Sequence, residues 1–304
     1  MKEIVSIGNP VFDIIETPYI KTSGRVLSGC STNAALAIGK LGGIAHLIGK
    51  VGKDFKDELV KVSQKYRVKA YFLESKETGG FHLIYKGKEM RDRDLFILGV
   101  ADPIKFDEIP HELLNKDGYV LGPILQEIDA SFIDKITSIE NATILLDPQG
   151  TIREFENGRV KRVRKEWVIE SMKKIDIVKP NEHEAEVLFP AMSLERVAER
   201  IQKLNGKIGI VTLADRGSYI SFDNKVYHVP AYRTVERDPT GCGDVYGGSY
   251  LYWYLKEEDP LDAAVFASAA ASYMVESTGP DFPLPLDGVM ERYEKLKENV
   301  RRIL

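Results

Sequence analysis

The sequence predicts an α/β fold in which a mostly parallel sheet carries helices on both faces, with a small additional sheet. Short apolar runs alternate with amphipathic segments through most of the chain. The runs are continuous rather than alternating, which is typical of strands covered on both faces. The repeated order of strand and helix favours parallel pairing. One region breaks this rhythm, and its alternating pattern predicts the small sheet.

The buried strands and the helices between them follow from the length and period of the apolar runs. Each short continuous run predicts a strand, and each segment with a 3.6-residue period predicts a helix. The strands are Ile4–Ile7, Ala45–Ile48, Tyr119–Leu121, Thr143–Leu146, Ile175–Val178 and Ile208–Leu213, and the helices are Asn33–Leu41, Lys56–Tyr66, Asp129–Ser138, Glu182–Leu188 and Leu194–Leu204.

The small sheet is predicted from segments with one exposed face. Val68–Leu73 and Phe81–Lys86 flank a Gly79-Gly80 turn, and with Phe12–Pro18 they form a separate sheet. Two more hairpins are predicted from turn signals, over Arg153–Val163 at Asn157-Gly158 and over Ser218–Val229 at Asp223-Asn224. No linker divides the chain, so we expect a single domain over residues 1–304, with the small sheet within 11–29 and 68–100.

Composition narrows the function classes. Of 304 residues, 42 are Lys or Arg and 46 are Asp or Glu, so the net charge is −4 and no positive field favours a nucleic acid or a membrane. Cys30 and Cys242 are far apart, which excludes a disulfide framework and fits a cytoplasmic location. No run of about 18 apolar residues lacks a charge, so we expect no membrane span.

The segment Asp238-Pro-Thr-Gly-Cys-Gly-Asp244 carries the clearest chemical signal. Glycines before an apolar helical run place free backbone N–H groups at a helix N-terminus, where the dipole favours an anion such as phosphate. Asp244 falls in the same turn, where a carboxylate is repelled by phosphate unless it accepts a proton from an attacking hydroxyl. Alone, the segment is also compatible with an ordinary glycine-rich turn.

Two other phosphate motifs are absent. A dinucleotide-binding fingerprint requires G-x-G-x-x-G after the first strand, and here Gly247 comes one place too late, near the C-terminal end. A P-loop requires Lys followed by Ser or Thr, and Lys50 is followed by Val51. A nucleotide-dependent oxidoreductase is therefore disfavoured.

The segment resembles the D-T-x-G-A-G-D signature of the ribokinase-like, or PfkB, carbohydrate kinases, and the resemblance covers nearly the whole chain. It implies a three-layer α/β sandwich with a mostly parallel central sheet and a small β-sheet lid. It also implies Asp244 as the catalytic base and Gly241, Cys242 and Gly243 as the anion hole. Cys242 replaces the usual alanine.

Further motifs extend the resemblance to the nucleotide side. Asn181 and Glu184 match the N-x-x-E motif, which implies that Asn181 binds the nucleotide and that Glu184 acts on Mg²⁺, largely through water. Thr212 and Gly217 match a strand-end motif beside the nucleotide, although Ala214 replaces a glycine. An N-cap with an acidic first turn and an ordinary strand threonine remain alternative interpretations.

The acceptor side is predicted from the first strand and helix. Asp13 comes shortly after a strand end and matches the family's acid that holds two acceptor hydroxyls. Gly29 and Asn33 match G-G-x-x-x-N-x-A, with Ser28 in place of the first glycine. Asp13 in a loop turn and Asn33 as a helix cap remain alternatives. Lys88, Arg91 and Arg93 follow a lid strand and fit either a phosphate on the acceptor or a solvated hairpin edge.

These expectations combine into ATP-dependent phosphorylation of a hydroxyl group on a small sugar-like acceptor, with Mg²⁺. The resemblance allows K⁺ at Asp238 and Thr240, and it allows a homodimer through lid strands. A nucleoside, an inositol or a sugar phosphate remains an alternative acceptor. An alternative of another class is a non-catalytic sugar or nucleotide sensor, which would not need Asp244.

Overall fold

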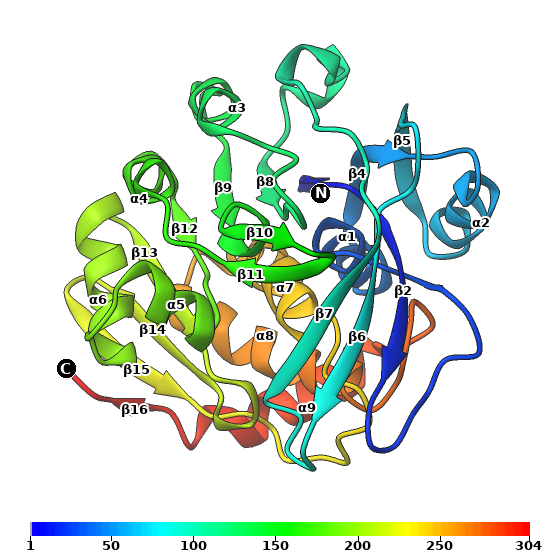
Figure 1. Ribbon diagram of the computed structural model, residues 1–304. Coiled ribbons are helices and arrows are strands. Elements are labelled where there is room, and N and C mark those ends of the chain that lie inside the picture. Colours follow the sequence, from blue (N-terminus) through cyan, green and yellow to red (C-terminus); the bar gives the residue numbers. More distant parts are fainter. Residues whose placement is uncertain (1) are drawn as a thin grey trace.

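The computed structural model describes residues 2–304 and shows an α/β fold with two separate sheets (Figure 1). Within these residues the large sheet has ten strands, in the order β16-β15-β14-β13-β12-β9-β8-β1-β4-β5. Strands from β13 to β5 pair in parallel, whereas β14, β15 and β16 form an antiparallel edge. The strands are β1 (Glu3–Ile7), β4 (Ile44–Val51), β5 (Val68–Glu74), β8 (Gly118–Leu121), β9 (Thr143–Leu146), β12 (Ile177–Val178), β13 (Ile208–Thr212), β14 (Ser218–Phe222), β15 (Lys225–Val229) and β16 (Arg301–Arg302).

Helices cover both faces of the large sheet, as continuous apolar strands require. One apolar core lies against α1, α2, α7, α8 and α9, and a second lies against α3, α4, α5 and α6. The helices are α1 (Cys30–Lys40), α2 (Lys56–Lys65), α3 (Ala130–Ile136), α4 (Glu166–Met172), α5 (Glu182–Leu188), α6 (Leu194–Asn205), α7 (Cys242–Glu257), α8 (Pro260–Met274) and α9 (Leu286–Lys297). None of the helices in residues 2–304 is long and apolar enough to cross a membrane.

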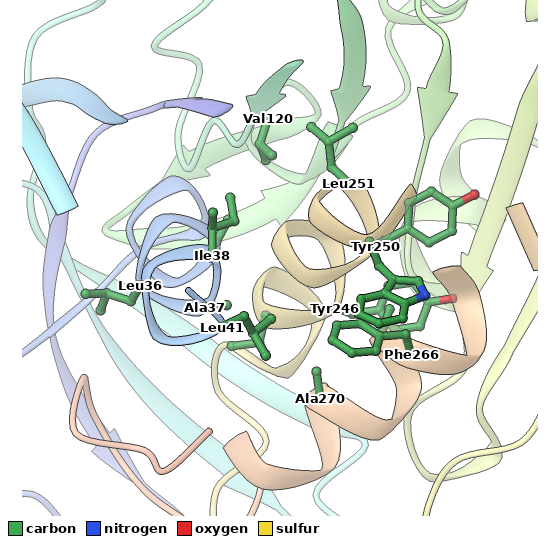
Figure 2. Close-up of a cluster of buried hydrophobic side chains, with 14 of the residues drawn as sticks. Leu36, Ala37, Ile38, Leu41, Val120, Tyr246, Tyr250, Leu251, Phe266 and Ala270 are labelled. Atoms are coloured by element: carbon green, nitrogen blue, oxygen red, sulfur yellow. The ribbon is translucent and has the colours of Figure 1, made fainter. Parts of the chain in front are cut away.

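Helix α7 begins at the glycine-rich turn and is packed against β8, α1 and α8. Figure 2 shows Leu251 of α7 pointing toward Val120 of β8, with α1 on one side and α8 on the other. Trp253 of α7 stacks on Phe266 of α8, with ring centroids 4.0 Å apart. Small residues such as Ala270 let α8 lie close to α7 (Figure 2). These contacts on both sides of α7 fix the position of its N-terminus.

The small sheet has the order β10-β11-β7-β6-β2-β3 and forms the lid. Its strands are β2 (Val11–Glu16), β3 (Val26–Ser28), β6 (Gly80–Lys86), β7 (Asp92–Gly99), β10 (Arg153–Glu156) and β11 (Arg159–Arg162). Its inner face has an apolar core of its own, which includes Phe81, Leu83 and Leu95. The hairpins predicted at Asn157-Gly158 and Asp223-Asn224 are present.

The lid differs from the prediction at one strand. The segment assigned to the lid at Val68–Leu73 is β5, which pairs in parallel with β4 at the edge of the large sheet. Gly80 is the first residue of β6, whose antiparallel partner is β7 rather than β5. An edge strand has one partly solvated face, so its pattern resembles that of a lid strand. The lid thus lies within 11–28 and 80–99, together with the β10–β11 hairpin.

Candidate active site

A cleft of about 260 Å³ lies between the inner face of the lid and the end of the large sheet. Asp147 directly follows β9, Lys179 directly follows β12, and Thr212 ends β13. These are the carboxyl ends of parallel strands, where ligands bind in open α/β sheets. The N-terminus of α7 lines the cleft as well, with Gly241 and Asp244.

The first turn of α7 is shaped by Gly241, which has a φ of +83°. A side chain at this position would also begin 2.6 Å from Nδ2 of Asn33. The N–H of Cys242 donates to the carbonyl of Pro239 at 3.2 Å, so it is used within the turn. The other first-turn N–H groups have no partner inside the helix. At this turn the amides of Gly241, Gly243 and Asp244 therefore remain available to an anion, whereas the amide of Cys242 is already hydrogen-bonded.

Asp244 is held by two side-chain amides. Its Oδ2 accepts a hydrogen bond from Nδ2 of Asn33 at 2.9 Å, and its Oδ1 accepts one from Nε2 of Gln149 at 3.5 Å. Burial raises the pKa of Asp244, and the nearby charge of Asp147 raises it further. A base works best when its pKa approaches the working pH, so these surroundings suit proton abstraction.

Asn33 lies behind the wall of the cleft and is not part of its lining. It is fully buried inside α1, whose N-cap is Gly29, and it touches Asp244 rather than the open cleft. Its second polar atom, Oδ1, has no hydrogen-bond partner within residues 2–304. Asn33 therefore orients the acid. Gly29 and Ser28 line the cleft on the acceptor side.

Asp13 lies on the inner face of β2 and is only 3% exposed. Its Oδ1 accepts a hydrogen bond from the N–H of Phe81 at 2.8 Å. Burial raises its pKa to about 6, although the bonds from Phe81 and Ser28 and the charges of Arg93 and Arg153 lower it. The lid thus contributes one buried carboxylate to the cleft.

Two arginines, Arg153 and Arg93, also line the cleft near the two carboxylates. Arg153 is buried at the start of β10, and its Nη2 donates to Oε1 of Gln149 at 2.7 Å. Burial and the charge of Arg93 lower the pKa of Arg153 to about 10. Arg93 lines the cleft from β7 and donates to the hydroxyl of Tyr85. Arg93 is thus part of the cleft wall rather than of a solvated hairpin edge.

The nucleotide side contains the predicted N-x-x-E pair. Asn181 caps α5, and the two residues form a reciprocal capping box. Both oxygens of Glu184 accept bonds from Asn181, at 2.9 Å from its N–H and at 2.8 Å from its Nδ2. Burial raises the pKa of Glu184. A carboxylate with both oxygens engaged fits Mg²⁺ held through water better than a direct metal ligand.

Thr212 and Gly217 border the same side of the cleft. Thr212 forms a parallel bridge with Asn181, so the two predicted nucleotide residues lie side by side. Gly217 has a φ of +93°, and a side chain there would clash with the carbonyl of Val229. Ala214 stands where the family has a glycine, and it adopts a positive φ of 53° although it carries a side chain.

The comparison with known proteins assigns the family. Residues 1–287 match the pfkB family carbohydrate kinases. The chain belongs to this family. The predicted resemblance is therefore confirmed. The predicted activity, ATP-dependent phosphorylation of a hydroxyl group on a small sugar-like acceptor, is confirmed as well. A non-catalytic sensor is not favoured.

Relatives in the PfkB family act on several acceptors. A nucleoside kinase of Methanocaldococcus jannaschii is 27% identical over 313 residues, which cover 97% of this chain and 98% of that protein. A cytidine kinase of Thermococcus kodakarensis is 25% identical and covers 87% of this chain and 92% of its own. The fold matches that of a pyrophosphate-dependent ribokinase-family kinase complexed with myo-inositol, with a TM-score of 0.81, 21% identity, and coverage of 95% and 99%.

Among the predicted PfkB site residues, most lie at the cleft and two lie behind it. The residues at the cleft are Asp13, Gly29, Asn181, Glu184, Thr212, Gly217, Thr240, Gly241, Cys242, Gly243 and Asp244. Asn33 and Asp238 are buried outside its lining. The site residues missed were Asp147, Gln149, Arg153 and Lys179. Two of them, Asp147 and Lys179, directly follow predicted strands, and that position was a usable signal.

Proposed function

We propose that Asp244 is the catalytic base of this carbohydrate kinase and that Asp13 holds the acceptor. The observation that supports this most is the position of Asp244. It lies in the first turn of α7 beside unpaired amides, and its surroundings raise its pKa. Asp13 lines the same cleft from the lid. An acceptor held by Asp13 would thus lie between the lid and the base.

The mechanism is in-line phosphoryl transfer. Asp244 takes the proton of the acceptor hydroxyl as that oxygen bonds to the γ-phosphorus and the bond to the bridging oxygen breaks. The amides of Gly241 and Gly243 donate to the oxygens of the transferring group. Asn33 and Gln149 keep the carboxylate aimed into the cleft.

The phosphates of ATP are proposed to bind at Asn181, Thr212 and Gly217. Mg²⁺, when bound near Glu184, would neutralise charge on the phosphates. Glu184 serves through water, because Asn181 occupies both of its oxygens. Pyrophosphate is proposed as a candidate additional donor, since two structural neighbours are pyrophosphate-dependent kinases.

The acceptor is proposed to be a compact polyol such as a sugar or an inositol. Leu83 and Leu95 pair across β6 and β7 and line the cleft from the lid. Asp13, Arg93 and Arg153 are the charged groups around this end. An apolar wall beside a few charged donors and acceptors suits a ring with hydroxyl groups. Nucleosides remain candidates because two relatives are nucleoside and cytidine kinases.

A K⁺ site is proposed beside Asp238. This residue is fully buried, and its Oδ2 has no partner within the described chain. Burial raises the pKa of Asp238, and the hydroxyl of Thr278 lies close enough to Asp238 to lower that pKa in part. The hydroxyl of Thr240 instead contacts Tyr85 at 3.0 Å, so Thr240 is the weaker ligand candidate. Turnover in KCl that equals turnover in tetramethylammonium chloride would reject this site.

We also propose a cytoplasmic location, where ATP is supplied. A homodimer that forms through the outer face of the lid is a further proposal. Phe96 and Leu98 of β7 are 37% and 38% exposed. Phe96 pairs with His82, and His82 pairs with Ile14, so these side chains share the outer face. Light scattering tests the dimer: wild type should have twice the mass of a Phe96→Asp/Leu98→Asp variant, and a monomeric wild type rejects it.

The first experiment measures release of ADP with ribose, fructose, myo-inositol, nucleosides and sugar phosphates as acceptors. Asp244→Asn should lower kcat by about 10²- to 10⁴-fold, the usual contribution of a general base. The control is Asp107→Asn, which removes an exposed carboxylate outside the cleft. Unchanged turnover in Asp244→Asn would show that another group is the base. A parallel series with pyrophosphate identifies the donor.

A further inference from the structure

Lys179 is a buried cation at the centre of the cleft. It directly follows β12, and its side chain is 2% exposed. Its Nζ lies 2.7 Å from Oδ2 of Asp147, which is 6% exposed. An ammonium group has three donors, and the hydrogen bond to Asp147 is the one that Nζ makes within residues 2–304. Two donors thus remain for another acceptor.

The side chain of Lys179 lies along the first two turns of α7. Its Cε is 3.2 Å from the point where a side chain at Gly247 would begin. Its Nζ is 3.6 Å from the corresponding point at Gly243. Gly243 belongs to the turn whose free amides form the anion hole. The ammonium group therefore lies next to the site where a phosphoryl group would bind.

The charge of Lys179 is stable. Burial lowers its pKa, but the neighbouring charge of Asp147 outweighs burial, so the pKa of Lys179 is raised above its ordinary value. A buried ion pair contributes little to stability compared with an apolar pair of the same volume. A purely structural role would also leave two donors unsatisfied in a buried place. Both arguments favour a ligand for the ammonium.

We propose that Lys179 is a catalytic cation of the phosphoryl site, donating to an oxygen of the transferring group while Asp147 fixes its position. The proposal rests on the assignment of the α7 turn as the phosphate site. The acceptor oxygen bonds to phosphorus, the bond to the bridging oxygen of the donor breaks, and the acceptor proton passes to Asp244. Lys179 keeps its own proton throughout and offsets the negative charge on the group in flight.

The test compares Asp147→Asn with the double variant Asp147→Asn/Lys179→Met. Lys179→Met alone would leave Asp147 as an unpaired buried charge, which is strongly destabilising. The double variant removes both charges, and methionine approximates the length of the lysine stem. Asp147→Asn keeps the cation, so it is the matched reference. Thermal melting confirms that both variants are folded at the assay temperature.

Two readouts separate a phosphoryl contact from a structural role. Relative to Asp147→Asn, the double variant should lose about 100-fold in kcat, the usual effect of removing one donor to a developing anion. Calorimetry should show that the double variant binds the ATP analogue AMP-PCP at least about 10-fold more weakly than Asp147→Asn, as expected for a lost charged hydrogen bond. The affinity of the two variants for ADP should be nearly the same. Equal kcat in the two variants, or equal losses for ADP and AMP-PCP, would overturn the proposal.

The binding measurement does not depend on the acceptor. If wild type phosphorylates no acceptor but the double variant still loses affinity for AMP-PCP alone, the assigned reaction is wrong and Lys179 is still a γ-phosphate ligand. If turnover depends on Asp244 but the two variants are equal, the reaction is right and Lys179 is structural.

Discussion

The large sheet and the lid each form one side of the cleft, but they hold their side chains differently. Every residue of β8 is buried, whereas β7 in the lid alternates between exposed and buried positions. Asp147 and Lys179, at the ends of large-sheet strands, bond to each other. On the lid, Tyr85 contacts Thr240, which lies just before α7, at 3.0 Å. In the proposed function, the large sheet and its helices therefore position the base and the phosphate site, and the lid contributes the groups that hold the acceptor.

The largest effect on the lid side is expected from Asp13→Ala. Losing two charge-assisted hydrogen bonds to an acceptor, each about 1.5–3 kcal/mol, should lower kcat/KM for the acceptor by about 10²-fold or more. The affinity for ATP should stay close to that of wild type, because the donor binds the other side. Initial rates and ATP calorimetry measure the two sides separately.

The control for Asp13→Ala is Asp94→Asn, which changes a carboxylate on the outer face of the same sheet. We expect it to change kcat/KM less than threefold. An Asp13→Ala enzyme with normal acceptor kinetics would mean that the lid does not bind the acceptor, and the division between the two sides would fail.

Acidic pH should act on both sides at once. The pKa values of Asp13, about 6, and of Asp244 are raised mainly by burial, and each group works as the carboxylate. The rate kcat/KM should therefore fall as pH falls through about 6, with a slope approaching two when both groups titrate. In Asp13→Asn the slope should fall to one, and a slope still approaching two would contradict the assignment of Asp13.

Stability should depend on pH in the opposite sense. An acid whose pKa is higher in the folded state stabilises the fold below its unfolded pKa, and this contribution is lost as pH rises through about 6. Asp13→Asn should therefore raise the melting temperature more at pH 8 than at pH 5. The gain has an upper bound of about 3 kcal/mol, from a shift of roughly two units. A gain that does not change with pH would show that burial of the charge is not its cause.

The smallest effect is expected at the lid tip. Arg91 donates two hydrogen bonds to Asp215, at 3.0 and 2.7 Å, and its carbonyl accepts one from His183 at 3.0 Å if Nε2 carries the proton. The two bonds to Asp215 join the β6–β7 hairpin to the loop after β13. Because the ion pair is about half exposed, Arg91→Ala should raise KM for the acceptor only about two- to fivefold.

Lys88→Ala is the matched control for Arg91→Ala, since it removes an exposed cation from the same hairpin. High salt should reduce the difference between wild type and Arg91→Ala by screening the exposed pair. If KM is the same in all three proteins, the contact at the lid tip does not contribute to closure.

The same division accounts for what could be predicted from the sequence. The parallel strands were predictable because a short continuous apolar run such as Thr143–Leu146 is typical of a strand buried on both faces. The assignment of Val68–Leu73 to the lid was wrong because an edge strand of the large sheet and a lid strand share a half-exposed pattern. Local pattern predicts the type of an element, whereas strand neighbours depend on the whole chain.

At the site, the α7 turn was predictable because Gly241 to Asp244 are consecutive residues that act together. Gln149 was not, because its contact is with Asp244, a residue far away in the sequence. The hydrogen bond between Asn33 and Asp244 was not predictable either, since it depends on how α1, which begins at Cys30, packs beside α7. Such pairings appear only once the helices and strands are packed.

The chain enters and leaves the lid three times, through β2–β3, β6–β7 and β10–β11, and each time it returns to an element of the large sheet or to a helix that covers it. The β2–β3 excursion places Phe12 and Leu27 in the core of α1, α7 and α8, whereas the core residues of β6 and β7 form a separate cluster. Leu83 and Leu95 belong to this separate cluster and not to the core that holds α1 and α7, so we expect changes at Leu83 or Leu95 to leave the position of Asp244 unaltered. In an ancestor with this arrangement, substitutions in the lid alone could change the acceptor, while the residues proposed for phosphoryl transfer stayed the same.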